Sequence, residues 1–339
     1  MDIETLSTLL ADSEHADIWK AVAGACQEGV AIRPVTAEVN RSLGETDAVV
    51  LNLSMQQGRF NHPGVSWSEN DDEVTFEFTE EAIRHYLIGA GRIYPLSWSA
   101  RSKFGGLPDV PEGFDWPVGS DDYFEFIAQF DLSELPDFRR RSDLPAVGML
   151  SFFLDMSGDH YESDHLPVVC RYFPDVSALE TVGRHPRKDG WERRDVWCRD
   201  AADCLDQKTK AVSGVSLAMM PMLYLPDRDH VFSVSGDEEG CRWKELRAFG
   251  GDRYTQVSTH IDEVAHSLGV RNEWTDTRLL GEPRFAQDTS FKDNERLLLQ
   301  FAGWGPYSFG DAGNVYVAID REDLVAGRFD QVRATWDCY

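Results

Sequence analysis

A short basic segment that contains two adjacent glycines is the first place in this sequence where side chains could do chemistry. Arg101 and Lys103 stand just before Gly105 and Gly106. Adjacent glycines permit positive φ and close backbone approach, so their N–H groups could cradle an anion beside the two cations. A tight structural turn leading toward Trp116 is the alternative, and we favour it because many Gly-Gly turns bind nothing. The spacing is not that of a P-loop.

Two glutamines, Gln129 and Gln300, each interrupt an apolar run. An amide is costly to bury unless both its donor and its acceptor are paired. The structural interpretation is a side chain that clamps a neighbouring loop, and we favour it because most buried side-chain hydrogen bonds serve the backbone. The functional alternative is a pair of amides that face a pocket near Lys103.

Three further segments combine polar or aromatic side chains. Residues 159–165 hold two histidines and three carboxylates, but the histidine spacing suits neither one helix face nor one strand face, so a solvated loop without metal is expected. Residues 184–194 are basic, and an internally paired loop is favoured over nucleic-acid contact. Residues 304–310 form a glycine and aromatic loop that is either a recognition edge or core packing. Trp304 and Tyr307 in this loop, and Asp311 directly after it, are candidate binding residues.

No catalytic motif with diagnostic spacing is present. GxSxG and HExxH are absent, and the six cysteines are scattered without CxxC pairs. The cysteine pattern indicates reduced structural thiols rather than a disulfide framework or a zinc knuckle. We therefore expect no metal, no cofactor and, more weakly, no enzymatic activity, although a site assembled only by the fold stays open.

The elements that must position these residues change in character near Ile93. From there on, short apolar runs separated by Gly, Pro and Asp indicate antiparallel strands and long loops. Two stretches repeat in the same order: residues 126–130 resemble 297–301, and residues 148–155 resemble 313–320. This order predicts an internal duplication.

The predicted fold class is α+β, with mainly antiparallel sheets. We expect a smaller N-terminal α+β unit over residues 1–92, and a domain over 93–339 whose related halves, about 93–175 and 275–339, are joined by a long middle segment. In the N-terminal unit, apolar spacing predicts a helix capped by Ser13 and stopped by Gly29, and a second helix between Thr79 and Gly91. Residues 48–53 and 72–78 read as strands.

The charge balance limits the classes of partner. With 59 acidic and 33 basic residues the net charge is −26, which disfavours nucleic acid and anionic lipid and favours basic protein surfaces. Solubility alone explains the charge about as well. The N-terminus lacks the pattern of a signal peptide, and no apolar run reaches the length of a membrane span. We expect a soluble cytoplasmic protein, without a prediction of its oligomeric state.

Several ordered motifs resemble the YwqG-like family, an uncharacterised bacterial group, over about residues 93–339. They are Ser102–Pro108, Trp116-Pro117, Phe126–Leu135, Leu144-Pro145, Gly148–Phe153, Gly310–Leu324 and Gly327–Asp330. Phe104 departs mildly from the family pattern. The resemblance implies an internally repeated α+β fold and, because such proteins are often neighbours of toxin systems, a role in immunity. It carries over no catalytic residues.

These observations lead to one leading hypothesis and one alternative. The leading hypothesis is a non-enzymatic protein-binding module that neutralises a toxin with a basic surface. The alternative is a small-ligand binder or an unrecognised enzyme, with its pocket between the two halves near Lys103, Gln129 and Gln300.

Overall fold

The protein is described by a computed structural model. It describes residues 8, 10, 13–34, 48–51, 65–70, 73–78, 86–89, 92–95, 97–119, 122–136, 141–156, 165–187, 209, 211, 214–226, 228–233, 243–267, 277–287, 291–292, 294–303, 307, 309 and 313–338. For the strands between residues 48 and 100 the structure describes the backbone and not the side chains.

Helix α2 (Ala16–Ala25) forms where the apolar spacing predicts it, and it buries Ile18, Val22 and Ala25. Ser13 lies at its start, where the Ser13 hydroxyl accepts a hydrogen bond from the His15 backbone N–H (3.1 Å). The predicted stop at Gly29 is wrong. The chain becomes extended at Cys26 and Gly29 already lies inside a strand, because strand pairing takes over there from the helical hydrogen bonds.

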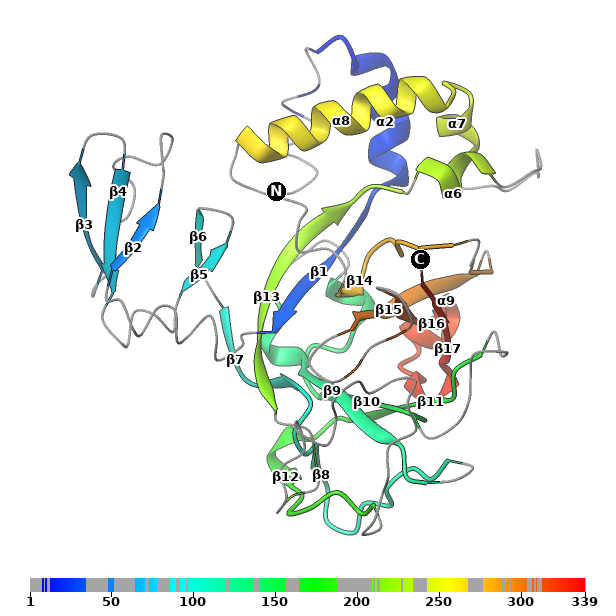
Figure 1. Cartoon of the computed structure of the whole chain (residues 1–339). Coiled ribbons are helices and arrows are strands. Elements are labelled where there is room, and N and C mark those ends of the chain that lie inside the picture. Colours follow the sequence, from blue (N-terminus) through cyan, green and yellow to red (C-terminus); the bar gives the residue numbers. More distant parts are fainter. Residues whose placement is uncertain are drawn as a thin grey trace.

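A ten-stranded antiparallel sheet organises the molecule (Figure 1). Its strands run in the spatial order β11-β10-β9-β7-β13-β1-β14-β15-β16-β17. Their bounds are β1 (Gln27–Pro34), β7 (Ser97–Phe104), β9 (Glu125–Asp131), β10 (Met149–Leu154), β11 (Val168–Phe173), β13 (Val215–Tyr224), β14 (Arg278–Leu280), β15 (Glu295–Ala302), β16 (Asn314–Asp320) and β17 (Arg333–Asp337).

The two ends of this strand order approach each other. Leu166, just before β11, forms an antiparallel bridge with Ala334 of β17, and its N–H donates to the Ala334 carbonyl (3.1 Å). The sheet therefore curves around one apolar core, to which β1, β7, β9, β10, β13, β15 and β16 all contribute buried side chains. We call the opposite side of the sheet its outer face.

Helices and smaller sheets complete the described structure. Helix α2 contacts α7 and α8, and Figure 1 shows these helices and α6 grouped beyond one end of strands β1 and β13. The remaining elements are β2 (Ala48–Leu51), β3 (Val65–Asn70), β4 (Glu73–Phe78), β5 (Tyr86–Gly89), β6 (Arg92–Pro95), β8 (Asp109–Val110), β12 (Glu180–Thr181), α6 (Arg228–Ser233), α7 (Lys244–Arg247), α8 (Gly251–Ser267), α9 (Arg321–Val325) and the 3₁₀ helices η1 (Leu132–Glu134), η2 (Arg141–Asp143), η3 (Val176–Ala178) and η5 (Phe329–Gln331). The predicted α+β class with mainly antiparallel sheets is confirmed.

The N-terminal region differs from the expectation in two ways. The predicted helix between Thr79 and Gly91 is wrong over residues 86–89, which form β5 and pair with β6. A short apolar run fits either period, and here cross-strand pairing decided. Strand β1, which the sequence pattern assigns to a separate N-terminal unit, instead lies between β13 and β14 near the centre of the large sheet.

Two pairs of strands occupy equivalent positions on either side of the centre of the large sheet, which lies between β13 and β1: β9 corresponds to β15, and β10 to β16. Gln129 of β9 pairs with Ser151 of β10, and Gln300 of β15 pairs with Tyr316 of β16. These pairs match the repeats found in the sequence. The correspondence in order and register is an observation, and an internal duplication remains our interpretation of it.

Candidate functional site

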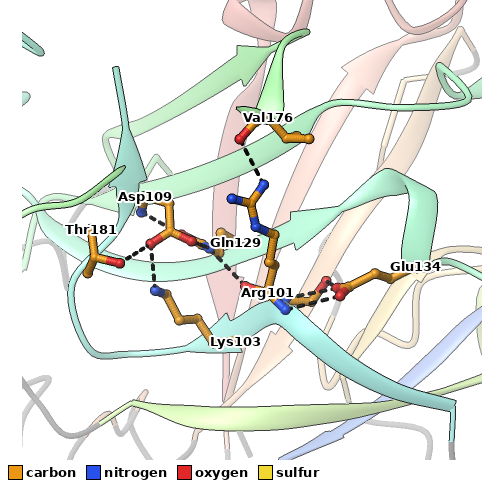
Figure 2. Close-up of polar contacts among 8 residues, drawn as sticks. Arg101, Lys103, Asp109, Gln129, Glu134, Val176 and Thr181 are labelled. Atoms are coloured by element: carbon orange, nitrogen blue, oxygen red, sulfur yellow. Dashed lines mark hydrogen bonds and ion pairs between the residues drawn. The ribbon is translucent and has the colours of Figure 1, made fainter. Parts of the chain in front are cut away.

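The candidate residues of the first half form one hydrogen-bonded network on the outer face of β7 and β9 (Figure 2). Gln129 is fully buried, and its Oε1 accepts from the Asp109 backbone N–H (2.9 Å). Its Nε2 donates to the Arg101 carbonyl (2.8 Å) and to the Asp109 carboxylate (2.7 Å). Every polar group of this amide is therefore satisfied, and it ties strand β7 to the loop that carries β8.

Asp109 is the charged centre of the network. Its carboxylate accepts hydrogen bonds from Thr181 Oγ1 (2.5 Å) and from Lys103 Nζ (3.1 Å). Burial raises the pKa of Asp109, but the hydrogen bonds from Thr181 and Gln129 and the charge of Lys103 outweigh burial and hold this pKa below its usual value. Asp109 is therefore ionised at neutral pH and holds Lys103 in place.

A second carboxylate, that of Glu134 in η1, holds the start of the same segment. It accepts hydrogen bonds from the backbone N–H groups of Arg101 and Ser102 (both 3.0 Å) and from the Ser102 hydroxyl (2.8 Å). The Arg101 guanidinium donates away from this carboxylate, to the Val176 carbonyl (2.8 Å). Arg101 and Lys103 thus lie close together, but each already has a partner within the chain.

The adjacent glycines form a tight turn, as the favoured interpretation predicts. Gly105 and Gly106 have φ values of 61° and 74°, which lie in the left-handed region. The Gly105 N–H donates to the Ile127 carbonyl (2.8 Å). A Cβ on Gly106 would lie 3.1 Å from the Gly214 Cα. The turn therefore serves close packing of two backbones, and the Gly105 N–H is not available to an anion.

In the second half, Gln300 and Asp337 hold the loop that follows β14. Gln300 is also fully buried, and its Oε1 accepts from the Arg284 backbone N–H (3.0 Å). Asp337 accepts from the N–H groups of Ala286 and Gln287 (2.9 and 3.1 Å). Among the residues that the structure describes, however, the Gln300 Nε2 atom has no hydrogen-bond partner. The strand order places β7, β13, β1 and β14 between the strands of Gln129 and Gln300, so the sheet does not bring the two amides together.

This asymmetry gives a stability prediction. Gln129→Met removes the partner of the Asp109 N–H, a donor to the Arg101 carbonyl and one of the three side-chain donors to the Asp109 carboxylate, whereas Gln300→Met removes the acceptor of one N–H. At about 1–3 kcal/mol for each unsatisfied buried group, we expect Gln129→Met to destabilise the protein by at least ~1 kcal/mol more than Gln300→Met. Urea denaturation of the two variants measures the difference. Equal losses would contradict it.

A buried charged cluster lies at the start of β9. Glu125 and Arg187 form an ion pair (2.5 Å), and both are almost fully buried. The Nδ1 atom of His185 accepts from the Arg187 backbone N–H (3.1 Å), and its Nε2 is 3.2 Å from the Phe124 carbonyl. Trp116 packs on the His185 ring at 4.6 Å and donates to the same carbonyl (2.7 Å).

The protonation of His185 follows from these contacts. Because Nδ1 accepts a hydrogen bond, the neutral ring carries its proton on Nε2 and donates to Phe124. Burial, followed by the positive charge of Arg187, lowers the pKa of His185 to about 3. The Glu125 carboxylate, 3.9 Å from Nε2, is already engaged by Arg187. The sequence signal for this cluster is the basic segment 184–194, for which internal ion pairing is the favoured interpretation.

The other candidate residues have separate places. Tyr307 is buried in the main core and its hydroxyl is 3.5 Å from the Phe126 carbonyl, which corresponds to core packing rather than a recognition edge. Trp116 is half-buried. Trp304, Asp311 and residues 159–164 lie outside the described residues.

Metal-binding clusters and membrane-spanning helices are both absent from the described part of the chain. No three histidine, cysteine, aspartate or glutamate side chains among the described residues are grouped so as to hold a metal ion. Among the described helices, none has the length and hydropathy needed to cross a membrane.

Comparison with known proteins adds one finding. A family model described as a domain of unknown function (DUF1963) matches residues 102–338. That span contains the whole polar network except Arg101, and it excludes α2 and β1. No curated protein matches the chain.

Proposed function

This chain belongs to the DUF1963 family, a domain of unknown function, and from that premise we propose that it is a non-enzymatic module that binds a basic protein. The net charge of −26 is the observation that carries the proposal. An acidic surface attracts a basic partner, speeds the encounter and disfavours nucleic acid and anionic lipid.

The polar network supports the same function in a second way. Arg101, Lys103, Asp109, Gln129 and Glu134 are all engaged with other parts of the chain, and together they hold loops against the outer face of the sheet. A surface that is already ordered loses less conformational entropy when it binds a partner. The network thus prepares a rigid binding surface instead of providing reactive groups.

The specific role within this proposal is toxin neutralisation in the cytoplasm. It is supported by the resemblance of residues 93–339 to the YwqG-like family, which is compatible with the family match. A protein that masks the basic face of a toxin needs acidic charge and no chemistry of its own.

Co-expression tests this role. The chain is produced together with any basic toxin that proves to be encoded beside its gene, and growth and complex formation are measured. We expect rescue of growth and a co-purified complex whose Kd weakens at least about tenfold between 50 and 300 mM salt, because charge drives the association. Absence of rescue and of any complex would overturn the toxin role, and a complex insensitive to salt would overturn its electrostatic basis.

One observation favours the alternative of a small-ligand binder. The Nε2 group of Gln300 is buried and has no acceptor within the described part of the chain, although the Nε2 group of its counterpart Gln129 has two. A ligand with a carbonyl or phosphate oxygen would satisfy it. A thermal-shift screen of metabolites tests this alternative: a stabilising compound should lose its effect in Gln300→Met and keep it in Gln129→Met.

A further inference from the structure

Three aromatic residues form a partly exposed surface at the outer face of β10 and β11, two on the loop after β8 and one at the end of β11. We define this aromatic loop surface by Phe114, Trp116 and Phe173, all of which are half-buried. The Phe114 ring centroid lies 6.3 Å from that of Trp116 and 6.0 Å from that of Phe173. Phe114 and Trp116 rest on the buried ring of Phe153 in β10. The inner side of this surface is therefore packed, while each of the three residues is partly exposed.

Several carboxylates lie close to these aromatic residues along the chain. Glu112 and Asp115 flank Phe114, Asp175 follows Phe173 by two residues, and all three are exposed. The side chain of Ser177 donates to Asp175 and lowers the pKa of that carboxyl, so it is ionised at neutral pH. Glu180 is exposed as well. Residues 111–119 and 174–184 together carry four carboxylates and one positive charge, that of Arg184, and the Arg101 guanidinium also lies against this segment, on the Val176 carbonyl.

We propose that the aromatic loop surface is the docking site for an arginine-rich segment of the basic partner. This inference rests on the proposed function and names the surface that performs it. A guanidinium attracts the face of an aromatic ring and at the same time donates hydrogen bonds to carboxylates. Arginine fits such a surface better than lysine, because its planar group stacks on rings and is less strongly hydrated.

The loops that carry these residues are fixed before any partner arrives. The indole N–H of Trp116 donates to the Phe124 carbonyl (2.7 Å), and the ring packs on His185. Strands β8 and β12 pair, and the Thr181 hydroxyl donates to Asp109 (2.5 Å). Rigid aromatic anchors ringed by polar groups are typical of interface hot spots.

Fluorescence anisotropy with labelled deca-arginine and deca-lysine peptides tests the docking site. Phe114→Leu keeps an apolar side chain but removes the π face, so we expect deca-arginine to bind roughly three- to tenfold more weakly and deca-lysine to change less. Glu112→Lys combined with Asp115→Lys should weaken both peptides by more than tenfold. The matched control is Glu245→Lys with Glu322→Lys, which makes the same charge change on exposed residues of α7 and α9.

The outcomes separate this inference from the proposed function. Equal weakening in the two double variants, or no effect of Phe114→Leu on deca-arginine, would overturn the docking site while leaving a diffuse acidic attraction intact. Failure of the wild-type chain to bind either peptide would also overturn it. Rescue from a toxin, measured separately by co-expression, decides the proposed function. Circular dichroism confirms that each variant is folded.

Discussion

Replacing Arg187 by methionine is expected to lower the free energy of unfolding by about 3–5 kcal/mol, because the variant leaves the Glu125 carboxylate buried without its partner. The Arg187 Nη2 atom lies 2.5 Å from the Glu125 Oε1 atom, and neither side chain is appreciably exposed. Burial raises the pKa of Glu125, and Arg187 opposes that effect. Chemical denaturation of the variant and the wild type measures the loss.

A double variant provides the control. Glu125→Leu with Arg187→Met removes both charges together, so we expect it to recover at least about half of the loss, since a buried ion pair can be replaced by apolar side chains at little cost. In Arg187→Met alone, the pKa of Glu125 is higher in the folded than in the unfolded chain, so protonation of this carboxyl favours the folded state. That contribution disappears as pH rises through the raised pKa. A single variant as stable as the wild type would contradict the ion pair.

The stability of the protein should fall on acidification because of His185. The pKa of His185 is lowered from its ordinary value of 6.5 to about 3 in the folded protein, mainly by burial and then by the charge of Arg187. Between these values the unfolded chain binds a proton that the folded chain does not. The free energy of unfolding therefore decreases by about 1.4 kcal/mol for each pH unit below roughly 6.5.

The difference between wild type and His185→Gln isolates this effect from other titrating groups. A glutamine at this position cannot take up the proton, so we expect the variant to be less stable at pH 7 but to lose stability less steeply as the pH falls below roughly 6.5. Thermal and urea unfolding across this acidic range measure both slopes. If the free energy of unfolding fell equally steeply with pH in the wild type and in His185→Gln, the neutral His185 ring would not determine the acid sensitivity.

The Gln-bearing strands show how far local pattern can predict the site. An amide inside an apolar run predicts a side chain that clamps a loop, and both Gln129 and Gln300 accept from a loop N–H. The prediction succeeds for the amide oxygen, which accepts a backbone N–H in both strands, but the Gln300 Nε2 atom has no partner among the described residues. The identity of the partners was not predictable, since Asp109 and Arg284 reach the amides only through turns whose course depends on packing.

The buried cluster shows the opposite case. Glu125 and Arg187 are 62 residues apart, and only Arg187 lies in a segment that the sequence singles out, the basic residues 184–194. A charged residue at the start of a strand usually reads as solvent-facing, so its burial by a loop cannot be inferred from its own neighbourhood. The same limit applies to Trp116, whose ring is a candidate for binding but also covers His185.

The sequence by itself determined the acidic character, the antiparallel α+β class, helix α2 and the repeated strand pattern, because each depends on composition or on the spacing of nearby residues. Only the tertiary structure placed β1 between β13 and β14, curved the sheet until Leu166 reached Ala334, and assembled the Glu125, His185 and Arg187 cluster. These contacts join residues far apart in the chain. Such contacts form only where burial of the common core by all the strands offsets the entropy lost when the loops between them close.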